Sequence, residues 1–178
     1  YNKNHFSTPP TSWNALFNKN LKGKPGYPSI TQSYSPLVLI RIAEMNGGGM
    51  NSIDKGFSKL AGIKNRVQIF KLFEILDAIN QGDASVTPML NIFVRKDPSV
   101  PLSFTWPNDG GIGILHLACI IKGTKKKVLA EQFLDFYLSD RNQSHMAQNG
   151  GDSPVNKNVS VPKGTKYTMV TEDQVSKL

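Results

Sequence analysis

The chain has 178 residues, of which 39% are hydrophobic and 9% aromatic, a composition that suits one packed domain and argues against a disordered segment. Its net charge of +8 raises nucleic acid as a partner, but the lysines are scattered, and their only run, at 125–127, has no neighbouring aromatic residues to stack on bases. The single cysteine excludes an internal disulfide, and no apolar run approaches the roughly 18 residues of a membrane-spanning helix.

Turn and cap signals divide the first half of the chain into helices and short strands. Ser12 is expected to cap a short helix, because a serine hydroxyl accepts a hydrogen bond from a free backbone N–H of the first turn. Ser35 followed by a proline predicts the start of a largely buried helix, which the glycines at 47–49 end. The expected elements are a helix at 13–17, a strand at 27–30, and helices at 36–45, 53–60 and 70–81.

The second half alternates between predicted strands and helices. The apolar run at 112–121, which contains Cys119 and His116, is too continuous for a surface strand and predicts a buried one. Apolar residues at helical spacing predict a helix at 126–138. The expected elements are strands at 85–90, 102–106 and 112–121, followed by helices at 126–138 and 140–148. Strands that alternate with helices predict an α/β fold in which helices cover the faces of a sheet.

Several short motifs follow one another in a fixed order along the chain. They are Tyr1-Asn2, Ser12-Trp13, Leu21-Lys22-Gly23-Lys24, Ile53-Asp54-Lys55-Gly56-Phe57, Gln81-Gly82-Asp83, Trp106-Pro107-Asn108-Asp109-Gly110-Gly111, the segment 130–139 and Pro154-Val155-Asn156. In this order they resemble the second half of the family 1 bacterial extracellular solute-binding proteins, which include receptors for polyamines, ferric iron and thiamine.

The resemblance implies a periplasmic binding protein type II-like lobe, with a mixed sheet flanked by helices. In that family the polypeptide begins in lobe one, crosses into lobe two and later crosses back. Residues from about 8 to 105 would then form the core of lobe two, and residues from about 106 to 178 the return and C-terminal helical segments. The upstream lobe-one segment would be absent, so the chain is expected to be a single ligand-binding lobe of a two-lobed receptor.

The resemblance also implies a binding function in which no chemical reaction is catalysed. The expected protein is the substrate-binding component of an ABC importer, which captures a small solute in the cleft between lobes and delivers it to the permease in the inner membrane from the periplasm. Two alternatives stay open: a ligand-sensing domain of a regulator with the same fold, and a small α/β enzyme. The enzyme is less favoured, because the three histidines have no metal-ligand spacing and no Gly-x-Ser-x-Gly motif occurs.

Four places are candidates for contact with the solute. The hydroxyls before the helix at 36–45 could donate to an anion near its N-terminus, although plain capping by Ser35 is the alternative. An indole at the turn 106–111 could stack on a flat or cationic solute, although a core role suits a tryptophan equally. A histidine in the predicted buried strand and an asparagine at the end of the strand 85–90 complete the set. The residues are Ser33, Tyr34, Ser35, Asn91, Trp106, Asp109, Gly110, Gly111 and His116.

The residue types at these places restrict the solute. Polyamine receptors of the family carry acidic side chains before the first buried helix, where this chain has Ser33, Tyr34 and Ser35. A dication without carboxylates would lose its hydration without compensation, so a polyamine is disfavoured. Iron receptors use paired tyrosines, and only Tyr34 is expected near the cleft. The sequence therefore favours a neutral or anionic small organic solute, with no cofactor and no metal.

Overall fold

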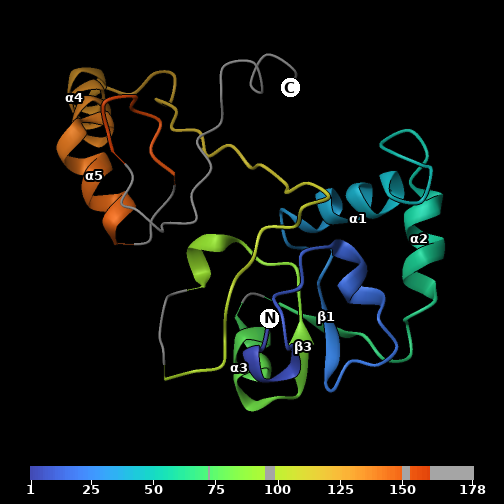
Figure 1. The fold of residues 1–178 in the computed structure, drawn as a ribbon. Coiled ribbons are helices and arrows are strands. Elements are labelled where there is room, and N and C mark those ends of the chain that lie inside the picture. Colours follow the sequence, from blue (N-terminus) through green and yellow to red (C-terminus); the bar gives the residue numbers. More distant parts are fainter. Residues whose placement is uncertain (72, 95–98, 150–152, 161–178) are drawn as a thin grey trace. The chain divides into compact units, whose positions relative to one another are not determined.

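The computed structural model describes residues 1–71, 73–94, 99–149 and 153–160 (Figure 1). The chain divides into two compact units, Tyr1–Ile112 and Gly113–Leu178. The first unit is an α/β structure with a small parallel sheet flanked by helices, as predicted, and the second carries a pair of helices. The predicted division into a lobe core at 8–105 and return segments at 106–178 stays a prediction.

The sheet of the first unit has three parallel strands in the order β2-β1-β3. They are β1 (Lys24–Pro28), β2 (Gln68–Phe70) and β3 (Ala84–Val86). The chain leaves β1, forms β2 on one side and then crosses to form β3 on the other side. The connection after β1 therefore leads to one side of that strand, whereas β3 lies on its other side. Open parallel sheets bind ligands outside the carboxyl ends of strands at such a change in strand order.

The central strand contains two prolines, which cannot donate a hydrogen bond to a neighbouring strand. The flanking residues supply the bonds instead: the Lys24 N–H donates to the Asp83 carbonyl at 2.8 Å, and the Ser29 N–H donates to the Phe70 carbonyl at 2.8 Å. The strand was predicted at 27–30 and begins three residues earlier, because the glycines and proline at 22–26 indicated a turn.

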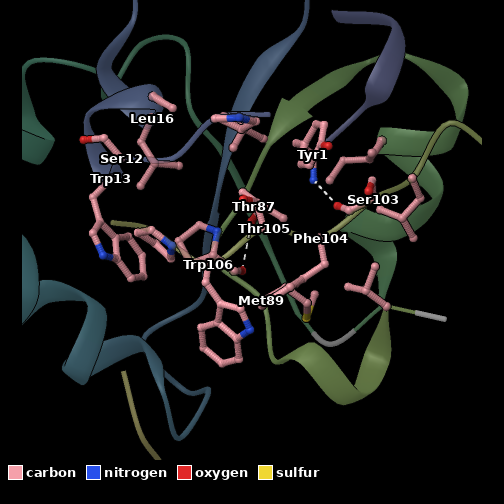
Figure 2. Close-up of a pocket in the computed structure, with 18 of the residues that line it drawn as sticks. Tyr1, Ser12, Trp13, Leu16, Thr87, Met89, Ser103, Phe104, Thr105 and Trp106 are labelled. Carbon is pink, nitrogen blue, oxygen red and sulfur yellow. Dashed lines mark hydrogen bonds between the residues drawn. The ribbon is translucent and has the colours of Figure 1, made fainter. Parts of the chain in front are cut away.

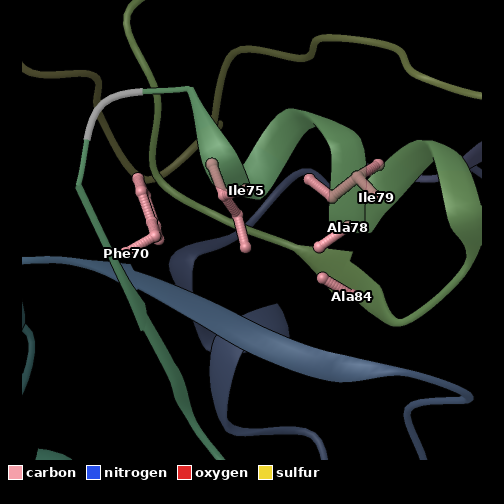
Figure 3. Close-up of a cluster of buried hydrophobic side chains, with 5 residues drawn as sticks. All are labelled: Phe70, Ile75, Ala78, Ile79 and Ala84. Atoms are coloured by element: carbon pink, nitrogen blue, oxygen red, sulfur yellow. The ribbon is translucent and has the colours of Figure 1, made fainter.

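The core of the first unit lies between the sheet and α3 (Glu74–Gln81). Figure 3 shows its cluster, in which the α3 side chains point toward those of β2 and β3. The members are Phe70, Ile75, Ala78, Ile79 and Ala84. Helix α3 was predicted to begin at Phe70, but Phe70 ends β2 and the helix begins at Glu74; Leu72, placed in the same prediction, lies outside the described residues.

Helix α1 (Ser35–Glu44) packs against α2 (Asp54–Ala61). Both helices lie close to their predicted positions at 36–45 and 53–60. Gly56 allows the two helices to approach closely, because a methyl group placed there would lie 2.7 Å from the Leu39 carbonyl oxygen. The predicted cap by Ser35 is wrong. Tyr34 occupies the cap position, and the Ser35 hydroxyl, fully buried, donates to the Pro28 carbonyl at 2.9 Å. This bond ties the start of α1 to the end of β1.

Two further predicted strands are longer than those in the structure. The strand at 85–90 is shortened to β3, and Asn91 begins the short 3-10 helix η3 (Asn91–Phe93). The strand at 102–106 is reduced to a single antiparallel bridge between Leu102 and Asn2. A strand forms only where a neighbour completes its backbone hydrogen bonds, and apolar composition does not provide that neighbour.

The buried strand predicted at 112–121 is also wrong. Within the described ranges this segment has no regular secondary structure, and none of its side chains is buried: Leu117 is 82% and Ile121 81% exposed, and the isoleucines at 112, 114 and 120 are half-buried. Cys119 is exposed, and so is His116, which the sequence placed in a buried strand. The apolar run indicated burial, but in the described residues no second layer covers it.

The second unit contains α4 (Lys127–Leu138) and α5 (Asp140–Gln148), both close to their predicted bounds. Ser139 separates them and caps α5 by accepting a hydrogen bond from the Asn142 N–H. The predicted apolar face of α4 forms, but its side chains Leu129, Phe133 and Phe136 are each more than half exposed. Among the described helices, none has the length and apolar character needed to cross a bilayer.

Gly82 ends α3 in a left-handed conformation, with φ of 91°. We expect Gly82→Ala to lower the free energy of unfolding by about 1 kcal/mol, because a side chain in that conformation meets its own backbone. Urea unfolding followed by circular dichroism measures the loss. Gly62→Ala is the matched control, since Gly62 ends α2 with φ of −64°; equal losses at the two positions would contradict the conformational explanation.

Candidate functional site

A cavity of about 100 Å³ lies in the first unit, next to the carboxyl end of β3 (Figure 2). The segment after β3 supplies Thr87, Pro88 and Met89 to its wall. The short 3-10 helix η2 (Trp13–Phe17) and the segment 102–107 supply much of the remainder, and further residues come from α3 and the N-terminal segment. Ligands of open parallel sheets bind outside the carboxyl ends of strands where the connections diverge, and this cavity occupies such a place. We call it the edge cavity.

The lining of the edge cavity is uncharged in its side chains. Aromatic and aliphatic residues dominate, and the polar side chains are hydroxyls and the tryptophan N–H groups. Neither a carboxylate nor a basic side chain belongs to the lining residues. They are Tyr1, Pro10, Ser12, Trp13, Ala15, Leu16, Leu76, Ile79, Val86, Thr87, Pro88, Met89, Val94, Leu102, Ser103, Phe104, Thr105, Trp106, Pro107 and Gly111.

Two indoles stand on the wall, and both are held by the turn at 107–111. The Trp13 Nε1–H donates to the Gly110 carbonyl at 2.7 Å. Trp106 meets Phe104 in an edge-to-face pair, with ring centroids 5.1 Å apart and an interplanar angle of 82°. A methyl group on Gly111 would lie 3.0 Å from the six-membered ring of Trp106, so a glycine there lets the backbone pass close to the indole. The turn thus fixes where both rings lie.

Asp109 joins this turn to the start of η2. Its carboxylate accepts from the Ser12 hydroxyl at 2.7 Å and from the Trp13 backbone N–H at 3.2 Å. Ser12 in turn accepts from the Asn14 N–H, so the predicted serine cap of this helix is present. A carboxylate at a helix start satisfies free N–H groups, and here it also connects residues 96 apart in sequence. The contacts give Asp109 a positioning role beside the cavity.

Tyr34 approaches the same region from the loop after β1. Its hydroxyl donates to the Met89 sulfur at 3.7 Å, and Met89 lines the edge cavity. Burial raises the pKa of Tyr34 to about 12, and burial likewise raises the pKa of Tyr27, whose hydroxyl donates to the Ser35 carbonyl, to about 12. Both phenols are therefore neutral at physiological pH, and neither supplies a charge to the cavity.

The predicted site residues are only partly brought together. Trp106 and Gly111 line the edge cavity, Asp109 and Gly110 hold its walls, and Tyr34 reaches it through Met89. The remaining candidates lie elsewhere: Ser33 is exposed, Ser35 is buried under β1, Asn91 begins η3, and His116 belongs to the second unit. Trp13, Phe104 and Met89 were missed as site residues, because the contacts that assemble them join distant parts of the chain.

A serine and a histidine also meet in the first unit. The His5 Nδ1 lies 2.8 Å from the Ser85 hydroxyl oxygen, which also accepts from the Gly23 N–H at 2.7 Å. Ser85 is fully buried. A serine nucleophile needs an exposed oxygen that a substrate can reach, whereas this one joins three segments of the core. The pair therefore acts as a structural link between the N-terminal segment, β1 and β3.

The environment of His5 predicts a pH dependence of stability. Burial, and then the charge of Lys22, lower the pKa of His5 below 6.5. Because the unfolded chain takes up the proton first, the stabilisation is complete above pH 6.5 and is lost as the pH falls below it. Urea midpoints measured from pH 8 to pH 5 should fall more steeply for the parent than for His5→Asn, which keeps a hydrogen-bonding atom near Ser85. Equal slopes would contradict the prediction.

Comparison with known proteins gives one match. The sequence model of the family described as bacterial extracellular solute-binding protein matches residues 1–178, the whole chain. No curated protein and no solved structure matches. The described residues contain no group of three or more histidine, cysteine, aspartate and glutamate side chains that could hold a metal ion. The match confirms the predicted resemblance to solute-binding proteins.

Proposed function

The chain belongs to the bacterial extracellular solute-binding protein family, and we propose that it captures a small solute and delivers it to the permease of an ABC importer. In this proposal it works in the periplasm as an exported protein. The segment from about 8 to 105 acts as lobe two of a two-lobed receptor. Binding energy is used to hold the solute and close the receptor, so no nucleophile or general base is required.

The observation that supports the proposal most strongly is the position of the edge cavity. Trp106 and Gly111, named from the sequence alone, line it, and it lies at the carboxyl end of β3, where open α/β sheets bind ligands. Its volume of about 100 Å³ is below the roughly 300 Å³ at which pockets for drug-sized ligands begin. The first unit by itself therefore offers contacts for one part of a solute.

The cavity wall also bears on the predicted class of solute. A polyamine would bring positive charges, and the lining residues offer no carboxylate to receive them. The carboxylate of Asp109, which is bonded to two of the lining residues, already accepts hydrogen bonds from Ser12 and Trp13. This arrangement supports a neutral or anionic solute over a polyamine.

Thermal unfolding of the full chain with a panel of uncharged, anionic and cationic small solutes tests the binding function. We expect one class to raise the melting temperature in a saturable manner, because a ligand at a hundredfold its Kd stabilises the folded state by about 2.7 kcal/mol. Mass spectrometry should recover that solute unchanged. No response from any class at millimolar concentration, or conversion of the solute to a product, would contradict the proposal.

A further inference from the structure

We propose that the part of the solute held by the edge cavity is a flat, uncharged, nitrogen-containing ring that carries an N–H group. This inference rests on the proposed function and adds the chemical class of the recognised group. Four features of the edge cavity support it. They are the absence of charged side chains from the lining, the aromatic side chains, the volume, and the hydrogen bond that the Thr87 hydroxyl already donates.

The lining first restricts the charge of the recognised group. A carboxylate, phosphate or ammonium group entering the cavity would leave water for a wall of aromatic, aliphatic and hydroxyl groups. Such a transfer costs several kcal/mol unless a partner of opposite charge compensates it. No side chain of the lining residues carries a charge, so a charged part of the solute belongs outside the cavity.

The aromatic side chains then restrict its shape. Trp13, Phe104 and Trp106 stand around the cavity together with Met89, as Figure 2 shows. Aromatic rings and a polarisable sulfur interact best with another flat ring, either stacked or edge-on. The turn at 107–111 holds the indoles before any solute arrives, because Gly110 accepts from Trp13 and Gly111 lies against Trp106. Preformed walls of this kind select a flat group over a flexible chain.

The volume restricts the size to a single ring. A dry apolar cavity of about 150 Å³ in another protein binds benzene, so the edge cavity, at about 100 Å³ and open on one side, suits one ring and not a fused system. The rest of a larger solute would extend out of the cavity.

The hydroxyl of Thr87 provides a hydrogen-bond acceptor for the solute. Thr87 is a lining residue whose hydroxyl donates its proton to the Pro88 carbonyl at 3.2 Å, so toward a ligand its oxygen can only accept. The hydroxyl of Ser12, another lining residue, both donates to Asp109 and accepts from the Asn14 N–H. A ring that presents an N–H to Thr87 therefore gains a hydrogen bond that a pure hydrocarbon ring does not.

The chain offers a direct measurement, because it has two tryptophans and both line the edge cavity. Uracil is the probe for an uncharged ring with N–H groups, and 1,3-dimethyluracil is the same ring without them. Spermidine, glutamate and glucose represent cationic, anionic and uncharged non-planar solutes. We expect uracil to quench the tryptophan fluorescence of the full chain in a saturable way, with 1,3-dimethyluracil weaker and the other three without effect.

Two variants test the residues. Trp106→Ala should weaken uracil binding about tenfold to a hundredfold, the loss that follows removal of one aromatic stacking partner. Phe57→Ala, which removes an exposed aromatic side chain of α2 outside the lining, should leave the affinity unchanged. Thr87→Val keeps the shape of the side chain and should bring uracil down to the affinity of 1,3-dimethyluracil. Circular dichroism on each variant shows that the fold is retained.

The outcomes separate this inference from the function on which it rests. Saturable binding of spermidine, glutamate or glucose, with no response to uracil, would overturn the ring assignment and leave the binding function in place. Equal affinity of the parent and Trp106→Ala for uracil would place the ring elsewhere and overturn the inference. Absence of binding by every probe, and by the wider panel in thermal unfolding, would count against both.

Discussion

Gly26→Val is expected to destabilise the first unit more than any other single change considered for this protein. A methyl group on Gly26 would lie 2.7 Å from the Ile75 Cδ1 atom and 2.8 Å from the Thr87 Oγ1 atom, so there is no space for a side chain. Forcing atoms into a packed core costs about 1–3 kcal/mol, and the larger valine should reach or exceed the top of that range. This is a large share of the roughly 5–15 kcal/mol that holds a domain folded.

Urea unfolding, followed by circular dichroism, measures this loss as a lower midpoint. Gly113→Val is the matched control, because it makes the same substitution where no atom lies within 4 Å of the added group. Equal midpoints for the two variants would show that the close approach at Gly26 does not exist in solution. A milder variant, Gly26→Ala, should keep the fold but displace Thr87, and so weaken uracil binding at the edge cavity.

Gly26 shows why the core and the candidate site depend on each other. A methyl group on Gly26 would meet both Ile75, a member of the buried cluster, and Thr87, a residue of the cavity wall. The central strand is therefore the element from which both are positioned. A mutation that loosens the packing of the cluster should therefore also displace the cavity wall, because both pack against this strand.

The helices were predictable because their signals are local. The spacing of apolar residues and the flanking caps and glycines lie within the segment itself. Helix α5 begins at Asp140 and ends at Gln148, as predicted, and α4 begins one residue later than predicted. The cap of η2 by Ser12 was predicted for the same reason. Ser35 is not the cap because the helix begins one residue earlier than predicted, so Ser35 is its first residue and its buried hydroxyl donates to the Pro28 carbonyl.

The strands were harder to predict because a strand depends on a neighbour that the sequence does not indicate. β1 contains Pro25 and Pro28, yet it is the central strand, since Lys24 and Ser29 donate the flanking bonds. The apolar segment at 112–121 has strong strand composition, yet it pairs with no strand among the described residues. Composition therefore described the type of fold, and pairing decided where the strands lie.

In the candidate site, too, the residues with local sequence signals were predicted and those positioned by long-range contacts were not. Trp106 and Gly111 were predicted because a tryptophan followed by a dense turn signal is visible in one stretch of sequence, and the structure places both on the wall of a cavity. Trp13 and Met89 were not, because they join that wall only through long-range contacts. His116 was chosen because the resemblance places contact residues in the strand after the Gly-Gly turn, and the structure contains no strand there. Whether each residue contacts a solute stays a prediction.

Asp109→Ala is the second change for which we expect a large effect. The substitution removes the acceptor for the Ser12 hydroxyl and for the Trp13 N–H, and so weakens the link between the turn at 107–111 and η2. Hydrogen bonds to a charged group contribute about 1.5–3 kcal/mol when removal leaves a partner unsatisfied, and partial exposure here places the expected loss near 2 kcal/mol. The two tryptophans should lose their fixed positions, because the same turn holds Trp13 through Gly110 and Trp106 through Gly111.

Tryptophan fluorescence and urea unfolding together measure this effect. The emission of Asp109→Ala should shift to longer wavelength, since water reaches the indoles, and uracil binding should weaken although Asp109 does not itself line the cavity. Asp109→Asn keeps an oxygen acceptor and should recover part of both losses. Asp135→Ala removes an exposed carboxylate of α4 and should change neither. If Asp109→Ala kept the parental emission and affinity, the tryptophans would have to be positioned by their packing alone, and the carboxylate would contribute only to the start of η2.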